Sequence, residues 1–362
     1  MLKLIHAADL HLDSPFSGLS PEQAQRRRGE QRRTLTRLAD LARERNADAV
    51  LLSGDLLDGA RTYRETVQAL SAALAETGCP VFIAPGNHDF YESRSPYAAV
   101  TWPENVHIFT SGQVEGVELP GKNCVIYGAA FCAPQAERSP LEGFRVPEDG
   151  KLHVMTLHGD VEGGGAYGPI SRTDIAASGL DYLALGHVHR CSGLQREGAT
   201  FWAYPGCIEG RGFDELGEKG ALYIELEGHS CRAEFVPLCL RKYEILTVDL
   251  TGQQDARRAL LAALPGDTAR DTYRIVFTGE RGCPLELSEL ERELSPDFYG
   301  LSLRDKTRPA RELWARMGED TLTGLFLQEM SRRCAQTPDD DALALAVRFG
   351  LAALEGGEDV SL

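Results

Sequence analysis

The first hundred residues alternate between short apolar runs and longer stretches with apolar positions three and four residues apart. Short runs rich in β-branched and aromatic residues are typical of buried strands, and the wider spacing is typical of helices. The pattern predicts strands at 2–8, 47–53 and 81–84, with helices at 23–45 and 63–76 between them. This alternation indicates an α/β core.

From residue 105 the pattern changes to short apolar runs separated by glycine-rich turns. A second sheet, mixed or antiparallel, is expected here. Its predicted strands lie at 106–110, 124–130, 152–157, 182–185, 200–203 and 220–226.

A third pattern begins near residues 237–242. It predicts a small α+β domain with strands at 243–250 and 272–278 and helices at 256–264 and 285–294. After Pro309 only helical spacing remains. The expected division of the chain is therefore 1–240, 241–308 and 309–362.

Composition adds an expected compartment. Hydrophobic residues make up 43% of the 362 and charged residues 25%, which is ordinary for a globular protein. No apolar run approaches the roughly 20 residues that span a bilayer, and His6 and Asp9 come too early for a signal peptide. The nine cysteines form no CxxC pair. We therefore expect reduced thiols, a cytoplasmic location and no membrane association.

Charge is uneven along the chain. The net charge of −16 argues against binding nucleic acid through bulk electrostatics. Residues 26–45 are an exception, because eight arginines face three acidic residues, a net of 8 − 3 = +5. Two interpretations stay open: a track for phosphate groups, or a solvated helix face with ion pairs between neighbouring turns.

Polar residues gather where five of the predicted strands end. The carboxyl ends of strands are where α/β sheets build their sites, and glycine beside a polar residue allows close approach. Each motif alone also fits an ordinary turn. Together they predict a shared site. The motifs are DLH at 9–11, GDLLD at 54–58, GNHD at 86–89, HGD at 158–160 and GHVH at 186–189.

These motifs supply imidazole, carboxylate and amide groups without cysteine. That set suits Mn, Fe or Zn, and it argues against a closed structural zinc site. The supply exceeds what one ion needs. Two ions about 3.5–4 Å apart, sharing one carboxylate, would use it, and such pairs clamp the attacking and leaving oxygens in phosphoryl displacement.

The ordered motifs resemble those of the calcineurin-like metallophosphoesterases. The opening HAADLHLDSPF and the segment YPGCIEGRGFDELGEKGALYIEL at 204–226 are similar to the DNA repair exonuclease branch, the SbcD/YhaO-like nucleases. The resemblance covers about residues 1–240. It implies a two-sheet α/β/β/α sandwich for this part of the chain. The sequence pattern places the small α+β capping domain and a helical C-terminal tail after it.

The resemblance also implies two metal ions, with Mn²⁺ expected and Fe or Zn as alternatives. Asp55 would bridge them. The first ion would be held by Asp9, His11, Asp55 and His189. The second would be held by Asp55, Asn87, His158 and His187.

His88 is implied to face the substrate phosphate rather than a metal. It would act as general acid or as a cation that stabilises charge. Either Asp58 or Asp89 could orient its ring, and the sequence leaves both open. Arg211 is the candidate for a contact with DNA phosphate.

The implied function is metal-dependent hydrolysis of DNA phosphodiesters by a metal-activated water, as a repair exonuclease or endonuclease. One alternative is a small substrate, either a cyclic nucleotide or a phosphomonoester. Another is a scaffold subunit for an SMC-like ATPase.

The tail bears on partners. Residues 342–354 are apolar nearly all round, with Arg348 as the single charge, and Leu322, Leu325, Phe326 and Met330 form a second stripe. The two helices either pack on the chain itself or dock a partner. The resemblance implies an SbcC-like coiled-coil ATPase as that partner, and a second copy of the chain is an alternative.

Overall fold

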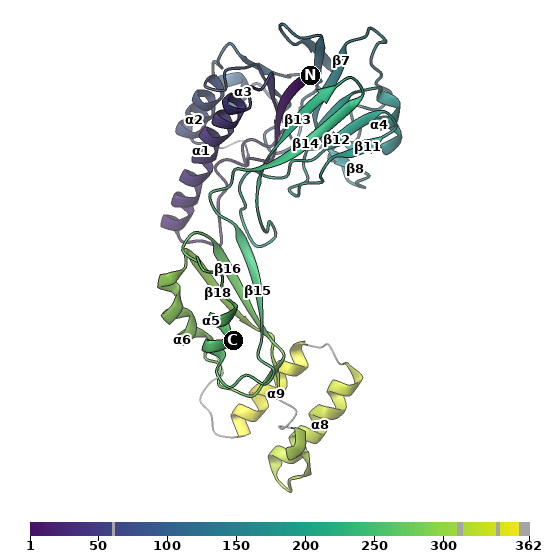
Figure 1. The fold of residues 1–362 in the computed structure, drawn as a ribbon. Helices are drawn as coiled ribbons and strands as arrows, with labels where there is room; N and C mark the ends of the chain where they lie inside the picture. The colour runs from purple at the N-terminus through teal and green to yellow at the C-terminus, as the bar shows by residue number, and fades with distance from the viewer. Residues whose placement is uncertain (60–61, 310–313, 338–340, 355–362) are drawn as a thin grey trace. The chain divides into compact units, whose positions relative to one another are not determined.

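The chain divides into two compact units, Met1–Lys242 and Tyr243–Leu362. The computed structural model describes residues 1–59, 62–309, 314–337 and 341–354 (Figure 1). The first boundary lies two residues from the one expected at 240. The structure groups everything after residue 242 together, so a separate tail domain stays a prediction. Parts of that tail, 310–313, 338–340 and 355–362, lie outside the described residues.

The first sheet has six strands in the order β14-β13-β1-β2-β3-β4. Strands β1 to β4 run parallel, and β13 pairs antiparallel with both β1 and β14. Most of their side chains are buried on both faces, which explains the unbroken apolar runs in the sequence. The strands are β1 (Leu2–Ala7), β2 (Ala49–Leu52), β3 (Val81–Ile83), β4 (Val106–Ile108), β13 (Gly220–Glu227) and β14 (Ser230–Pro237).

The second sheet has the order β11-β12-β10-β7-β6-β5. Its four inner strands are parallel and its two edge strands antiparallel, so the predicted mixed sheet is confirmed. Two of the strands expected in it, at 106–110 and 220–226, belong instead to the first sheet, where β4 pairs with β3 and β13 pairs with β1. The strands are β5 (Glu115–Glu118), β6 (Cys124–Gly128), β7 (Leu152–His158), β10 (Tyr182–Gly186), β11 (Gln195–Glu197) and β12 (Thr200–Ala203).

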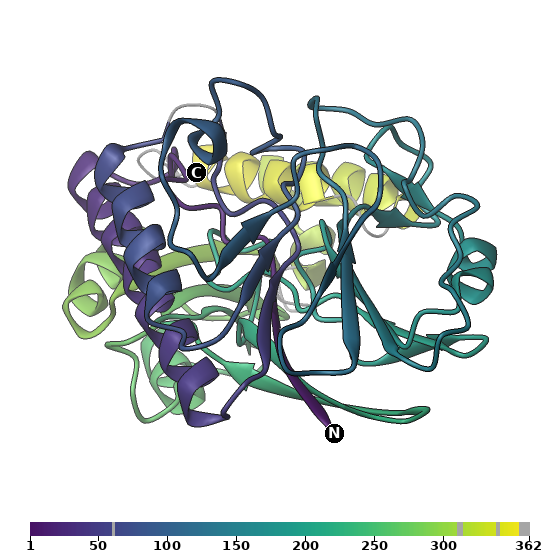
Figure 2. The ribbon, with the colours of Figure 1, turned by 90° about the horizontal axis from the view of Figure 1, so that it is seen from above.

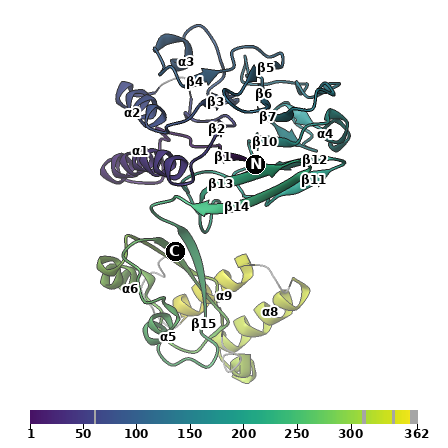
Figure 3. The ribbon, with the colours of Figure 1, turned by 45° about the horizontal axis from the view of Figure 1, so that its top comes forward.

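The two sheets pack face to face between helical layers, as predicted (Figure 3). In β1, Ile5 joins the core under α1 (Pro21–Glu44) and α2 (Arg64–Ala75), while Leu4 faces the second sheet. The two helices run side by side (Figure 2). On the outer face of the second sheet, α4 (Arg172–Ser178) buries Ile175.

Helix α1 begins at a capping box. The Ser20 hydroxyl accepts from the backbone N–H of Gln23, and the Gln23 side chain accepts from the backbone N–H of Ser20. Pro21 occupies the first helical position, where its missing N–H costs nothing. The helix therefore starts two residues before the predicted 23. Within the described ranges, no helix combines the length and apolar character needed to cross a bilayer.

The second unit is built on three parallel strands, β15 (Tyr243–Asp249), β16 (Thr272–Thr278) and β18 (Gly300–Asp305). The sequence pattern missed β18, whose glycine and serine weaken the strand signal. Helices α5 (Ala256–Ala263) and α6 (Leu287–Leu294) pack on the sheet and close a separate core. Two short strands, β17 (Glu280–Arg281) and β19 (Arg308–Pro309), pair beside it.

Helices α8 (Leu322–Gln336) and α9 (Asp341–Leu354) pack on each other around Leu327, Met330 and Val347. Gly350 lets α9 approach closely, since an added Cβ there would lie 2.1 Å from the Phe326 ring. Phe326 and Met330, two of the four residues in the predicted apolar stripe, therefore pack inside the unit. The other two residues of the stripe, Leu322 and Leu325, are 68% and 61% exposed.

Candidate metal centre

The predicted site residues come together at one edge of the sandwich. Asp9 and His11 follow β1, Asp55 follows β2, Asn87 follows β3, and His158 ends β7. Several hold backbone conformations that side chains rarely adopt, with φ of 52° at Asp9, 42° at His11 and 52° at Asp55. Such strain concentrates at functional sites. These backbone angles support this edge as the candidate functional site.

Two glycines make room for the cluster. A Cβ on Gly86 would lie 2.2 Å from the Asp55 carboxylate, and one on Gly54 would lie 2.6 Å from the His158 ring. Gly54 also has a φ of +84°. Neither position accepts a side chain while the cluster keeps its shape.

One half of the cluster contains His11 and His189. Their Nε2 atoms lie 3.1 Å apart and point at the same space. Asp55 Oδ2 lies 3.8 Å from His11 Nε2, and Asp9 Oδ1 lies 3.9 Å from His189 Nε2. These four side chains are the predicted ligands of the first ion.

Carboxylates hold the outer nitrogens of both rings. His11 Nδ1 lies 2.7 Å from Asp58, and His189 Nδ1 lies 2.7 Å from Glu215. Protonation at Nδ1 satisfies these contacts and leaves Nε2 free to bind a metal. Sequence reasoning missed Glu215, although it lies in the 204–226 segment that carried part of the resemblance.

The other half contains His158 and Asn87. His158 Nε2 lies 3.0 Å from Asn87 Oδ1 and 3.4 Å from Asp55 Oδ2, so Asp55 reaches both halves. The outer nitrogen, Nδ1, donates to the backbone carbonyl of Ser53 at 2.9 Å. Asp9 also approaches this half, in a group of close ligand atoms with Asp55 and His158.

His187 is placed less directly. Its ring lies edge-on to His158, with centroids 5.3 Å apart, and its backbone N–H donates to the Asp9 carboxylate. Among the described residues, its nitrogens do not join the groups of mutually close ligand atoms. Its role as a ligand stays a prediction.

Charge in the cluster favours a cation. Burial raises the pKa of Asp9 to about 6. Burial also acts to raise the pKa of Asp55, but the charge and hydrogen bond of His158, with the His11 charge and the His88 N–H, together hold that pKa well below its usual range. Burial opposes protonation of His158, yet Asp55 brings its pKa to about 9. Buried carboxylates thus demand a nearby positive charge, and oxygen and imidazole donors without thiolate fit a divalent metal.

His88 lies at the exposed side of the cluster, with its ring edge-on to that of His11 at 4.8 Å between centroids. Its side chain is 46% exposed, while its backbone N–H donates to Asp55 Oδ1. Of the two candidates for orienting its ring, Asp58 lies 3.8 Å from Nδ1. His11, Asp58 and His88 also form a group of close ligand atoms, so the geometry alone does not separate His88 from the metal ligands.

Asp89 faces elsewhere. It is buried and accepts backbone N–H groups of Gly86, Asp55 and Leu56, together with the hydroxyl of Tyr97. These bonds tie the loop after β3 to the loop after β2. Asp89 therefore supports the backbone around Asp55, and the structure gives no contact by which it would orient His88.

Arg211 lies at the rim of the site. Its guanidinium donates to Asp58 at 3.2 Å and to Glu215 at 2.8 Å. It thereby bridges the two carboxylates that hold His11 and His189. Its guanidinium also lies 3.1 Å from His189 Nδ1. The contact with DNA phosphate stays a prediction, because the observed partners of Arg211 all belong to the protein.

The arginine-rich segment is largely engaged within the protein. Arg27 is buried and pairs with Glu30 and Glu209. Three more arginines pair with surface acids: Arg32 with Glu65, Arg43 with Asp40, and Arg45 with Glu234. These contacts favour a structural helix face over a continuous phosphate track.

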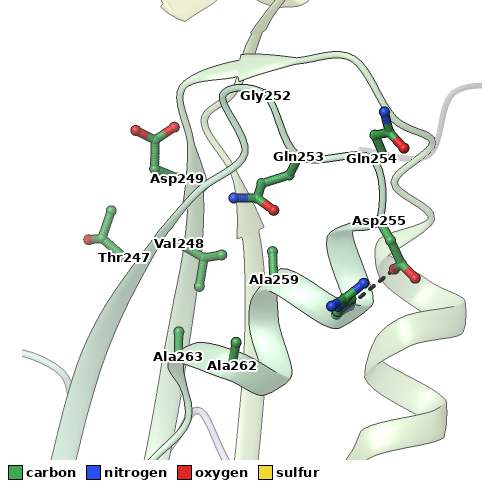
Figure 4. Close-up of a pocket in the computed structure, with 11 residues that line it drawn as sticks. Thr247, Val248, Asp249, Gly252, Gln253, Gln254, Asp255, Ala259, Ala262 and Ala263 are labelled. Carbon is green, nitrogen blue, oxygen red and sulfur yellow. Dashed lines mark hydrogen bonds between the residues drawn. The ribbon is translucent and has the colours of Figure 1, made fainter.

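A separate hollow of about 560 Å³ lies in the second unit, between the end of β15 and α5 (Figure 4). Asp249, Asp255 and Arg258 are among its lining residues, and Asp255 caps α5 by accepting the backbone N–H of Arg258. The lining contains no histidine or cysteine. It therefore does not reproduce the donor set of the strand-end cluster.

Comparisons with known proteins agree with the motifs. Residues 2–191 match the calcineurin-like phosphoesterase family. The uncharacterized metallophosphoesterase YhaO of Bacillus subtilis is 34% identical over 262 residues, which cover 69% of this chain and 64% of YhaO. The DNA double-strand break repair protein Mre11 of Aeropyrum pernix is 27% identical, with the same two coverages of 69% and 64%.

The SbcD component of the nuclease SbcCD from Staphylococcus epidermidis is 24% identical over 285 residues, covering 68% of this chain and 73% of the relative. The match thus spans about two thirds of the length of each relative. The family match takes in all five strand-end motifs, which confirms the predicted resemblance. The chain belongs to the calcineurin-like phosphoesterase family.

Proposed function

We propose that this phosphoesterase hydrolyses phosphodiester bonds in DNA, as an exonuclease or endonuclease in repair. The observation that carries the proposal is the strand-end cluster, in which Asp55 reaches two sets of nitrogen and oxygen donors. The names of two relatives, a DNA double-strand break repair protein and a component of a nuclease, support DNA as the substrate.

Two divalent ions, with Mn²⁺ expected, would be held by the two halves of the cluster. When bound, they would supply an activated water and neutralise charge on the phosphate. The chain's own residues then have clear tasks: Asp55 joins the halves, and the Asp58 and Glu215 carboxylates keep Nε2 of His11 and His189 available.

His88 acts on the phosphate from the open side. Its exposed ring is free to donate a proton to the leaving oxygen or to stabilise charge, with Asp58 beside it. Arg211 adds a positive charge at the same rim. Because its guanidinium already holds two carboxylates, we assign it first to keeping the rim in place and second to phosphate.

The exposed Leu322 and Leu325 on α8 support a docking role for the tail. We propose an SbcC-like coiled-coil ATPase as the partner, in a cytoplasmic complex. The ATPase would also supply a DNA-binding surface, which a chain with a net charge of −16 lacks. The relative whose name makes it one component of the nuclease SbcCD supports this. The alternatives are a second copy of the chain as partner, a small phosphoester as substrate, or a scaffold role.

One assay tests the function. The full chain, stripped with chelator and reloaded with Mn²⁺, is offered labelled single- and double-stranded DNA, a generic diester and a phosphomonoester. We expect Mn²⁺-dependent cleavage of DNA and of the diester. Cleavage of the monoester alone would contradict the DNA proposal, and no cleavage by an ion-loaded protein would favour the scaffold. Asp55→Asn should lose this cleavage, and Asp267→Asn, the same chemical change at an exposed position, serves as the matched control.

A further inference from the structure

Tyr167 lies over the second half of the metal centre. Its ring is stacked on His187, with centroids 5.5 Å apart and an interplanar angle of 30°. His187 in turn meets the buried His158 edge-on. Three rings therefore lead from the cluster outward, and the last of them, Tyr167, is 39% exposed.

The chain before Tyr167 leaves space open at Gly164, while Gly163 packs against Asp160 and Gly165 against the Tyr167 ring. Residues 163–166 are Gly-Gly-Gly-Ala, and an added Cβ on Gly164 would meet nothing within 4 Å. Glycine commonly marks places where a ligand approaches the backbone closely. No large side chain of this run stands between Tyr167 and solvent.

The backbone under the ring is nevertheless held in place. Tyr167 pairs with Ala136 in an isolated bridge, and the N–H of Gly168 donates to the Ala136 carbonyl at 2.8 Å. Gly168 packs against the Phe131 ring, where an added Cβ would lie 3.2 Å away. The partly exposed ring of Tyr167 is thus carried by an anchored stretch of backbone.

Neighbouring tyrosines are used differently. The hydroxyl of Tyr97 donates to Asp89, and that of Tyr204 donates to the Gly159 carbonyl and accepts from the Val161 N–H. Within the described ranges, the hydroxyl of Tyr167 has no such protein partner. Tyr167 contributes its ring rather than its hydroxyl.

We propose that Tyr167 is a stacking platform for the base of a nucleotide next to the scissile phosphate. This rests on the proposed DNA hydrolysis and narrows its substrate to DNA that presents an unpaired base, as a single strand or a frayed end. A phosphate at the metal cluster brings its nucleoside past His187 to this ring. Stacking accepts every base and needs no net positive charge, which suits a chain of −16.

The test uses an end-labelled single-stranded decathymidylate and a copy with one central abasic residue, both with Mn²⁺. Cleavage is read linkage by linkage, so it does not matter whether the enzyme works from an end. In the wild-type protein we expect one linkage beside the abasic residue to be cut roughly 5- to 100-fold more slowly, the range for loss of one base stack.

Two variants complete the cycle. Tyr167→Phe keeps the ring and should behave as wild type. Tyr167→Ala should slow all linkages of the intact strand by a similar factor and show no extra slowing at the abasic residue. Equal cutting beside the abasic residue by the wild-type protein overturns the platform without requiring any variant. A Tyr167→Ala protein that keeps the abasic effect, or loses bound Mn²⁺, also overturns it.

Failure of the parent proposal looks different. A wild-type protein with bound Mn²⁺ that cuts no linkage of the intact decathymidylate overturns DNA hydrolysis and the platform with it. Cutting that ignores the abasic residue overturns the platform alone.

Discussion

The two halves of the metal centre are held by different kinds of partner. His11 and His189 each place Nδ1 against a carboxylate, Asp58 and Glu215, at 2.7 Å. His158 instead donates to the backbone carbonyl of Ser53. A carboxylate makes the imidazole a stronger ligand and adds charge, whereas a carbonyl fixes the ring without adding charge.

The difference reflects position in the fold. The Ser53 carbonyl lies between the two sheets, where the Ser53 hydroxyl also bonds with His6 and Thr156. Asp58 and Glu215 lie at the rim and share Arg211. The packing of the sheets therefore fixes the orientation of His158. Individual side chains, which can be substituted one at a time, fix the orientations of His11 and His189.

Asp55→Asn should have the largest effect, because Asp55 serves both halves. The variant loses the shared negative charge between two cations that repel each other. We expect loss of at least one ion and a fall in hydrolysis beyond the roughly 10- to 100-fold of a lost supporting partner. Metal content by mass spectrometry and diester turnover measure this. Two bound ions and normal turnover in this variant would contradict the proposal that both ions share Asp55.

His88→Asn should lower the rate by about 10²–10⁴, the usual loss for a general acid, while both ions stay bound. His88 belongs to neither half in this scheme, so the two halves should be unaffected. Turnover and metal content are measured on the same sample. Loss of an ion would instead make His88 a ligand, as its grouping with His11 and Asp58 allows.

Glu215→Gln should weaken one half only. His189 keeps a hydrogen-bond partner but loses its carboxylate, and we expect about 10- to 100-fold weaker binding of one ion. A metal titration should then show one ion bound more weakly than in the wild type and the other unchanged. Glu142→Gln, at an exposed position, is the control. Equal weakening of both ions would erase the distinction between the halves.

Ser53→Ala should have a smaller effect on the metals, because it keeps the carbonyl that holds His158. Its cost should appear in stability, at about 1–3 kcal/mol, since His6 and Thr156 lose a buried partner. Urea unfolding measures the loss of stability, and the metal titration measures the effect on metal binding. A loss of metal affinity as large as that of Glu215→Gln would show that the carbonyl is not what sets this half.

Leu322→Ser with Leu325→Ser should leave hydrolysis of a small diester unchanged, because both side chains are exposed on α8. Association with an SbcC-like ATPase should be lost in pull-down with the purified partner. Normal association would show that Leu322 and Leu325 are not part of the docking surface. Loss of solubility would indicate instead that both leucines are covered within the protein.

The gathering of the five strand-end motifs into one site could be predicted from the sequence, because each strand and its end are marked by neighbouring residues. A buried strand is a short apolar run, and polar residues at its carboxyl end lie where a sheet builds a site. The different roles of Asn87, as a metal ligand, and His88, facing the phosphate, were implied by the resemblance to the family and not by this local pattern, and both stay predictions. The packing of α8 on α9 was likewise foreseen as one of two alternatives, from apolar spacing alone.

The partners of those motif residues were decided only by the tertiary structure. His189 meets Glu215 26 residues away, His11 meets Asp58 47 residues away, and His158 meets Ser53 105 residues away. Asp58 and Asp89 look alike in sequence, yet packing turns Asp89 onto backbone N–H groups and Tyr97. Local patterns specify strands and their ends, but which strand ends meet depends on how two sheets pack, and that is a property of the whole chain.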